Sequence, residues 1–199
     1  MKHKKEFPHL TLDELKRFFK RVDDHEGKGY ERELYRCLFY MAYKYGLRRS
    51  EIAHLNLDDV NFRTGKVKIW RAKKGVGNYF TLFKEVRKRL RSYLKHRTCT
   101  AGETALFINP RTGQRYSEKA VGFAAMFRTI IAEAGLAGYS IHCLRHSIAY
   151  HMANGDIPPE ETMDLLGHND ISSTLIYYKI GKERRHRYAQ AMEESEEIL

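Results

Sequence analysis

One stretch of the chain, residues 60–83, carries the only strong β-strand signal. It reads VNFRTGKVKIWRAKKGVGNYFTLF, and turn signals at residues 63–65 and 74–78 separate its β-prone runs. These runs predict a small antiparallel meander. On both sides of it, apolar residues recur at helical spacing. The sequence therefore predicts a mainly α fold with one small antiparallel sheet, of the α+β class.

The helices are predicted from apolar spacing, caps and stops. Thr11 and Glu14 have the spacing of a capping box, and Gly46 is placed to end the second helix. Ser50 is predicted to cap a short helix that runs through Leu55. The predicted helices cover residues 11–22, 31–45, 50–55, 84–97, 118–134, 140–153, 159–166, 172–178 and 182–194, with a short strand and turn at 105–116.

The charge balance of the chain gives a first indication of its partner. The 199 residues carry a formal net charge of +11. A basic surplus of this size favours a polyanionic partner, most often nucleic acid, although it does not identify one. Arg87, Arg91 and Lys95 line one side of a predicted helix at i+4 spacing. That stripe is either a solvated surface or a DNA-facing one.

Two further features bear on the compartment. No stretch approaches eighteen uncharged apolar residues, and no apolar signal core follows the N-terminus, so we predict no membrane span. The three cysteines, Cys37, Cys99 and Cys143, are few and widely spaced. This usage predicts free thiols in a reducing compartment.

The segment IHCLRHS, residues 141–147, crowds His142, Arg145 and His146 together. In a helix these positions are i, i+3 and i+4 and share one face, where like charges repel one another. The arrangement therefore needs a negative or metal partner. The candidates are a metal ion held by neutral imidazoles, a carboxylate of the protein, and a phosphate from outside.

A zinc site is the first of these alternatives. His142 and His146 have the spacing of two ligands on one helix, and His168 or His151 would have to complete the site. The HExxH pattern needs a glutamate where this chain has Cys143, and the arginine between the histidines opposes a divalent cation. Patterns typical of nucleotide-binding loops and of serine hydrolases are also missing from the sequence. We therefore predict no metal and no cofactor.

Other segments can complete a phosphate site. In YGLRRSE, Arg48 stands between one helix end and the next helix start, where backbone N–H groups favour anions, although it could simply pair with Glu51. LLGHND places His168 directly after a helix, although Gly167 there could be an ordinary C-cap. Tyr177 follows nine positions later and could instead be a core residue. The combination of these segments is what favours a phosphate.

In this order, the segments resemble the tyrosine recombinase, or phage integrase, family. YGLRRSEIAHLNLDDV is similar to its first arginine box, IHCLRHS to its HxLRH box, and LLGHNDISSTLIYYKI to its LGH box with the nucleophilic tyrosine. The resemblance covers residues 10–180 and implies the catalytic-domain fold of that family. It also implies site-specific cleavage and rejoining of DNA strands without metal or ATP. The site residues that it implies are Arg48, Lys74, His142, Arg145, His168 and Tyr177.

Two positions leave a choice between neighbours. Lys73 and Lys74 stand together on the predicted hairpin, and successive side chains of a strand point to opposite faces, so only one should reach the site. We favour Lys74, which precedes the turn glycine. Tyr177 and Tyr178 diverge by about 100° on a helix, and the spacing from the LGH box favours Tyr177.

The resemblance also implies roles. The two arginines would hold the non-bridging phosphate oxygens, and His168 would donate to one of them. Tyr177 would attack phosphorus and become bonded to the DNA 3′ end, with His142 helping to remove the phenolic proton and nearby cations favouring the phenolate. Lys74 would protonate the departing 5′ hydroxyl.

We expect residues 1–199 to form a single catalytic domain with its core at about 10–180 and no N-terminal core-binding domain, similar to the short fimbrial phase-variation recombinases. A catalytic domain cut from a longer integrase is the alternative. Residues 181–199 are expected to dock on a neighbouring protomer. The expected partners are double-stranded DNA and further copies of the chain, as a tetramer on DNA and a monomer when free, in the cytoplasm with the nucleoid. The alternative functions are a type IB topoisomerase-like activity and a non-catalytic DNA-binding regulator on the same fold.

Overall fold

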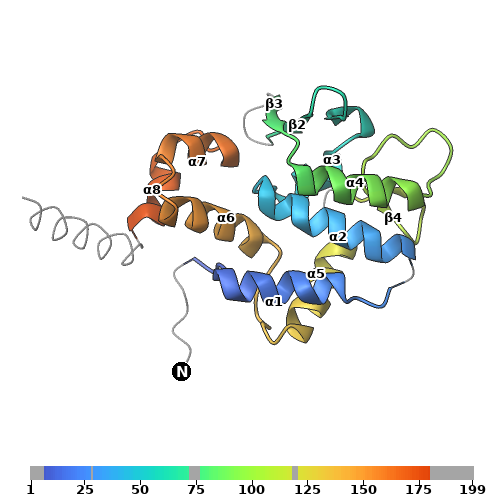
Figure 1. Cartoon of the computed structure of the whole chain (residues 1–199), viewed down its shortest axis with the longest axis horizontal. Coiled ribbons are helices and arrows are strands. Elements are labelled where there is room, and N and C mark those ends of the chain that lie inside the picture. Colours follow the sequence, from blue (N-terminus) through green and yellow to red (C-terminus); the bar gives the residue numbers. More distant parts are fainter. Residues whose placement is uncertain (1–6, 28, 72–76, 118–120, 180–199) are drawn as a thin grey trace, which may run out of the picture.

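The computed structural model describes residues 7–27, 29–71, 77–117 and 121–179, and most of them are helical (Figure 1). This confirms the predicted mainly α fold with small antiparallel sheets. The elements in chain order are α1 (Leu12–Asp23), α2 (Gly29–Lys44), α3 (Arg49–His54), the 3-10 helix η1 (Leu57–Asp59), β1 (Val60–Asn61), β2 (Lys66–Trp70), β3 (Gly77–Thr81), α4 (Lys84–His96), β4 (Ile108–Asn109), β5 (Gln114–Arg115), α5 (Val121–Glu133), α6 (His142–Asn154), α7 (Pro159–Leu166) and α8 (Ser172–Lys179).

The predicted meander is confirmed. Strands β1, β2 and β3 form one antiparallel sheet in that order, with Val60 opposite Val67 and Trp70 opposite Gly77. Strands β4 and β5 form a separate antiparallel hairpin. The connection between β2 and β3 lies outside the described residues, and with it the choice between the neighbouring lysines 73 and 74.

The helix ends show which capping predictions are correct. The capping box of α1 is confirmed, because the Thr11 N–H donates to the Glu14 carboxylate at 2.8 Å and the Glu14 N–H donates to the Thr11 hydroxyl at 3.2 Å. The prediction that Ser50 caps α3 is wrong. The cap is Arg48, in extended conformation, and its N–H donates to the Glu51 carboxylate at 2.9 Å. The cap lies two residues before the predicted Ser50, because Glu51 satisfies the free N–H group of Arg48.

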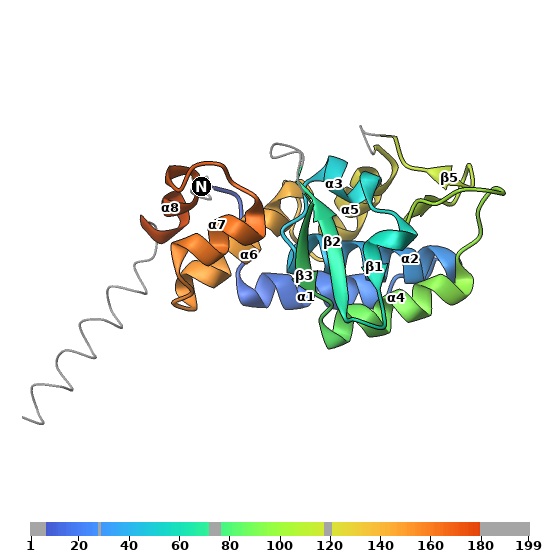
Figure 2. The ribbon, with the colours of Figure 1, turned by 90° about the horizontal axis from the view of Figure 1, so that it is seen from above.

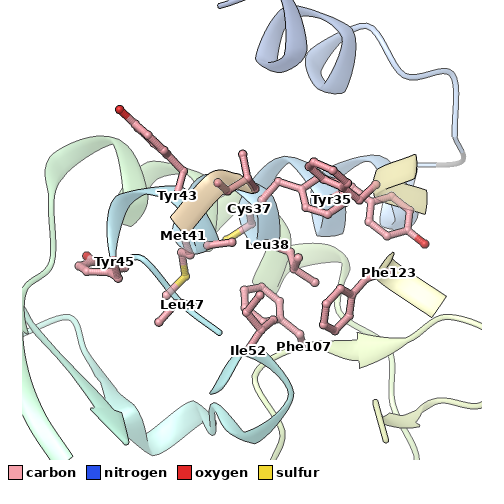
Figure 3. Packing of buried hydrophobic residues seen from close by; sticks show 14 of the residues in the cluster. Tyr35, Cys37, Leu38, Met41, Tyr43, Tyr45, Leu47, Ile52, Phe107 and Phe123 are labelled. Atoms are coloured by element: carbon pink, nitrogen blue, oxygen red, sulfur yellow. The ribbon is translucent and has the colours of Figure 1, made fainter. Parts of the chain in front are cut away.

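The core has two parts. The larger cluster lies around α2 and includes Phe18, Leu38 and Phe127, all fully buried. Figure 3 shows side chains of α2 next to Ile52, Phe107 and Phe123, so α3 and the β4 region close over this helix. The smaller cluster lies between α6, α7 and α8 and consists of Ala149, Ala153, Leu166 and Tyr177. Figures 1 and 2 show these three helices grouped at one end of the molecule.

Two compartment-related observations follow. In the described part of the chain, no helix has the length and apolar character needed to cross a membrane. Cys37 and Cys143 are buried thiols and Cys99 is an exposed one. Burial raises the pKa of the Cys37 thiol, so this group is not poised to react.

Candidate active site

An open pocket of about 520 Å³ collects the predicted site residues that the structure describes. These residues are far apart in the sequence, and they reach the pocket from the start of α3, from α6, from the end of α7 and from α8. Lys74, the remaining predicted residue, lies outside the described residues. The lining consists of Arg48, His142, Arg145, His146, His168, Ser172, Ser173, Ile176 and Tyr177.

Arg145 connects the segment before Arg48 to the segment before His168. It extends from α6, and only 2% of its surface is exposed. Its guanidinium donates to the Gly46 carbonyl at 2.6 Å and to the Leu166 carbonyl at 2.7 Å. Both carbonyls lie at helix C-terminal ends, where the backbone carries partial negative charge. The arginine therefore joins the end of α2, which leads to Arg48, to the end of α7, which leads to His168.

A second buried arginine, Arg71, joins the same two helix ends one residue earlier. Its guanidinium donates to the Tyr45 carbonyl at 2.9 Å and to the Leu165 carbonyl, and it pairs with the Glu51 carboxylate at 2.8 Å. Sequence analysis missed this residue. Nothing in the RAKKG pattern distinguishes a fully buried arginine from the basic residues beside it, because burial there depends on helices that are distant in the sequence.

Two glycines allow this close approach. Gly46 and Gly167 have φ values of +56° and +62°, a left-handed conformation that favours glycine. A Cβ atom on Gly46 would lie 2.7 Å from a Leu166 methyl carbon, and one on Gly167 would lie 2.6 Å from the Arg71 Cγ. The prediction that Gly167 ends its helix is confirmed. Both glycines therefore allow the ends of α2 and α7 to pack closely, in addition to ending these helices.

Arg48 lies on the pocket wall, and it also makes the predicted pair with Glu51. The Arg48 Nη1 atom is 2.7 Å from the Glu51 carboxylate, and 19% of the Arg48 side chain remains exposed. Burial alone would raise the pKa of the Glu51 carboxyl group, but Arg71 and Arg48 outweigh it and hold that pKa below its usual value. A buried carboxylate thus fixes the direction of Arg48.

The pocket is electrostatically positive. Burial and the nearby Arg48 lower the pKa of Arg145 to about 9, so this guanidinium is still a cation at neutral pH. The rings of His142 and His146 cross at 87° with their centroids 4.7 Å apart. Burial and the neighbouring cations lower the pKa of His142, and burial together with His142 lowers that of His146 to about 4. Both imidazoles are therefore neutral at pH 7 in the free chain.

The zinc alternative finds no geometric support. Within the described ranges, no three histidine, cysteine or acidic side chains are placed to hold a metal ion together. His146 instead shares a hydrogen bond with the Tyr177 hydroxyl at 2.8 Å, and His168 shares one with the Thr174 hydroxyl at 2.8 Å. These bonds orient the two imidazoles toward protein hydroxyls.

The two neighbouring tyrosines have different surroundings. Tyr177 is 3% exposed and lines the pocket. The Tyr178 hydroxyl donates to the Ile157 carbonyl at 2.6 Å and shares a hydrogen bond with the Thr162 hydroxyl at 2.7 Å. The second tyrosine thus anchors α8 on α7, and the first is the one whose hydroxyl bonds to a pocket residue, His146.

The expected effect of the nearby cations on the Tyr177 phenol is present, but burial outweighs it. In the free chain burial raises the pKa of Tyr177, and the opposing effect of Arg145 and Arg48 is smaller. The phenol is therefore protonated at neutral pH until something else removes its proton.

The segment before α1 covers this tyrosine. The Phe7 ring lies 6.0 Å from the Tyr177 ring and 6.1 Å from the His146 ring, between centroids. The Leu10 N–H donates to the Ser147 hydroxyl at 2.8 Å, which fixes the segment on α6. Sequence analysis gave no signal for this contact, because a single phenylalanine in a polar N-terminal stretch has no periodicity.

Comparison with known proteins agrees with the motifs. Residues 8–184 match the model of the phage integrase family. The tyrosine recombinase XerC of Chromobacterium violaceum is 37% identical over 142 residues, which cover 71% of this chain and 46% of the relative. The type 1 fimbriae regulatory protein FimE of Escherichia coli is 30% identical over 149 residues, which cover 71% of this chain and 72% of the relative.

Solved structures show the same fold. The XerA recombinase matches with a TM-score of 0.75 at 24% identity, over 96% of this chain and 66% of that one. The XerH recombinase in a post-cleavage complex with its difH substrate matches with a TM-score of 0.80 at 24% identity, over 94% of this chain and 54% of that one. The chain spans about half the length of the XerC relatives. The matched family model and these relatives establish that the chain belongs to the phage integrase family, the tyrosine recombinases.

Proposed function

We propose that this chain cleaves and rejoins DNA strands at specific sites through a covalent 3′-phosphotyrosine intermediate. One observation carries the proposal: Arg48, Arg145 and the Tyr177 hydroxyl meet at one pocket, with three histidines around them. Such a set suits a phosphodiester, because guanidinium groups bind its oxygens while a phenol attacks phosphorus. The XerH structure with a difH substrate supports DNA as the substrate class.

The geometry supports transition-state stabilisation by fixed charge. Arg145 is held by two backbone carbonyls and Arg48 by Glu51, so neither has to reorganise when the phosphorus becomes five-coordinate. One opposite charge at ~4 Å contributes about 4 kcal/mol at an effective dielectric constant of ~20. Two arginines could therefore supply a large part of the acceleration. His168 would donate to a phosphate oxygen, and Lys74 remains the proposed donor to the leaving 5′ oxygen.

The reaction as proposed conserves bond energy. The Tyr177 oxygen replaces the DNA 5′ oxygen on phosphorus, and a 5′ hydroxyl later reverses the exchange. No ATP or metal ion enters this proposal. The hydroxyl of Tyr178 is occupied by Ile157 and Thr162, which supports the choice of Tyr177 as nucleophile.

The test uses a duplex that the chain selects from a randomised library, nicked so that cleavage releases a short fragment. The chain should form a denaturant-resistant complex with this DNA in EDTA. Tyr177→Phe should form none, and the matched control Tyr178→Phe should retain it. A complex that survives Tyr177→Phe but disappears in Tyr178→Phe would move the nucleophile, and the lack of any complex in the parent chain would refute the proposal.

The same DNA separates the alternatives. A topoisomerase-like enzyme would relax a supercoiled plasmid without exchanging partners between two sites, whereas a recombinase would yield exchanged products. A regulator would bind the selected duplex with Tyr177 dispensable for every effect. Cytoplasmic, nucleoid-associated localisation stays a prediction that follows from the DNA substrate.

The assembly on DNA is a further part of the proposal. One similar solved structure is a lambda integrase dimer bound to a COC′ core site. We infer that this chain also assembles on DNA, as a tetramer at synapsis, with residues 181–199 docking on a neighbouring copy. Deletion of the residues after Gly181 should reduce synaptic complexes in native gels while leaving single-site binding intact, and unchanged synapsis would contradict the docking role.

A further inference from the structure

A row of cations along α4 takes no part in the cleavage chemistry proposed above. The row lines a shallow groove of about 800 Å³ and consists of Lys84, Arg87, Lys88, Arg91 and Lys95. We propose that this row, called the α4 face, binds the phosphate backbone of a second DNA duplex while a first duplex occupies the pocket. One copy of the chain then holds two DNA segments at once.

Strand β2 separates the α4 face from the pocket. At one end of the strand, Arg71 pairs with Glu51 of α3, behind the pocket. At the other end, the Leu82 N–H, just before α4, donates to the Gly65 carbonyl at 2.8 Å. Figure 2 shows α3 and α4 at these opposite ends of β2. The strand has five residues, which rise about 17 Å. The α4 face is therefore a surface of its own, at the far end of the sheet from the pocket.

The positive charge of the α4 face is not compensated within the chain. None of its five cations forms an ion pair with another of the described residues. The acidic side chain in the groove, Glu85, is taken by Arg89, whose Nε atom lies 3.0 Å from the carboxylate. Arg91 lies over the Phe62 ring instead, with 5.7 Å from its guanidinium carbon to the ring centroid. An aromatic ring orients a guanidinium without neutralising it, so the charge is available to an anion from outside.

The row has a length and spacing that suit a DNA backbone. Helix α4 packs on α2 through its buried side, and Lys84, Lys88, Arg91 and Lys95 are exposed. From residue 84 to residue 95 the helix rises about 16 Å. One DNA strand carries a phosphate every ~3.4 Å along the duplex axis, so the row can face about five phosphates. The five cations therefore meet a similar number of negative charges.

The chemistry of the groove favours DNA over an acidic protein. Apart from the cations and Glu85, the described residues that line it include only Ser92, so they offer no apolar or aromatic anchor. Protein interfaces usually depend on such anchors at their centre. Contacts to a phosphate backbone need only cations and polar groups, and they carry no sequence information. We therefore expect the second duplex to be bound whatever its sequence.

The test fills the pocket first and then offers a second duplex. The chain is collected on beads that carry an excess of the selected duplex, and a fluorescent duplex of unrelated sequence is added at about 0.1 M salt. The parent chain should retain the fluorescent duplex. The α4 variant, with Lys88→Gln, Arg91→Gln and Lys95→Gln combined, should bind it at least about tenfold more weakly. The log–log salt slope of this binding should fall by up to about 2.7, because each lost phosphate contact accounts for about 0.9.

The matched control combines Lys16→Gln, Arg17→Gln and Lys20→Gln on α1. It also replaces one arginine and two lysines on an exposed helix face, so it lowers the net charge equally. The control should retain the fluorescent duplex as the parent does. Loss of that duplex in the control as well would make the binding a bulk charge effect and overturn the proposal, and so would full retention in the α4 variant.

Two further measurements complete the test. A ten-residue polyglutamate peptide is the second probe, and binding of this peptide in preference to the duplex, lost in the α4 variant, would assign the face to an acidic protein and overturn the proposal. The α4 variant should form the covalent complex with the selected duplex as the parent does, since its three changed residues lie outside the pocket lining, and this also shows that it is folded. A failure of the proposed function shows separately, as the lack of a covalent complex in the parent chain.

Discussion

Glu51→Gln should cost this protein a large part of its stability. The carboxylate is 3% exposed and accepts from Arg48 Nη1 at 2.7 Å, from the Arg48 backbone N–H at 2.9 Å and from Arg71 Nη1 at 2.8 Å. The amide keeps the shape but removes the charge, so Arg71 stays buried without its counter-ion. Removing one partner of a buried ion pair typically costs about 3–5 kcal/mol.

The assay is urea unfolding and thermal melting followed by circular dichroism at pH 7. A loss of about 3–5 kcal/mol in a chain of this size lowers the melting temperature by roughly 6–20 °C. Asp58→Asn is the matched control, because Asp58 is an exposed carboxylate close by in the sequence. It should change stability by less than about 0.5 kcal/mol.

The pH dependence adds a second readout. The pKa of Glu51 is lower in the folded chain than its usual value of 4.5, so its stabilising effect is complete above pH 4.5 and is lost as the pH falls through the folded pKa. The stability difference between parent and Glu51→Gln should therefore be largest near neutral pH and shrink in acid. A difference that stays constant down to acidic pH, or a variant as stable as Asp58→Asn, would refute the reasoning.

Two further substitutions test the close approach of Gly167 to Arg71 and the packing of Phe7 on Tyr177. Gly167→Ala should destabilise the chain by about 1–3 kcal/mol, because the φ of Gly167 is +62° and an added Cβ would meet Arg71. Gly102→Ala is the control, because Gly102 also has a positive φ but lies in open space. It should cost less stability in the same melting assay. Equal costs at the two glycines would argue against the close approach. Phe7→Ala should slow covalent-complex formation about tenfold, or ~1.4 kcal/mol, by letting water reach the nucleophile, while the exposed Leu12→Ala should not. An unchanged rate in Phe7→Ala would remove the covering role.

The sequence predicted those parts of the site that depend on local pattern. Periodicity and caps placed α7 at its observed bounds and α8 within one residue, and linked motifs brought Arg48, Arg145 and Tyr177 to one pocket. Helix geometry allows only one of the two adjacent tyrosines to face the pocket, since their side chains diverge by about 100°, and the spacing of the resembling LGH box selected Tyr177. The hydrogen bonds of Tyr178 agree with that choice.

The parts that sequence reasoning missed depend on contacts between distant segments. Arg71 is buried because the ends of α2 and α7 meet around its guanidinium, and no sequence pattern around residue 71 indicates that contact. Phe7 reaches Tyr177 only because the chain before α1 runs along α6. The hydrogen bond between His146 and the Tyr177 hydroxyl could not be predicted either, because α6 and α8 are brought together only by the fold.

The way in which the arginines are held explains why the free pocket is still suited to a phosphate. Arg145 is held by two backbone carbonyls, which satisfy its donors with dipoles and do not neutralise its charge. Among the residues lining the pocket in the described chain there is no carboxylate, and Glu51 stands behind Arg48. A carboxylate bonded to Arg145 would neutralise its charge. Carbonyl ligands instead fix the guanidinium in place without cancelling it, so an entering phosphodiester becomes the missing counter-ion and its binding should also stabilise the fold.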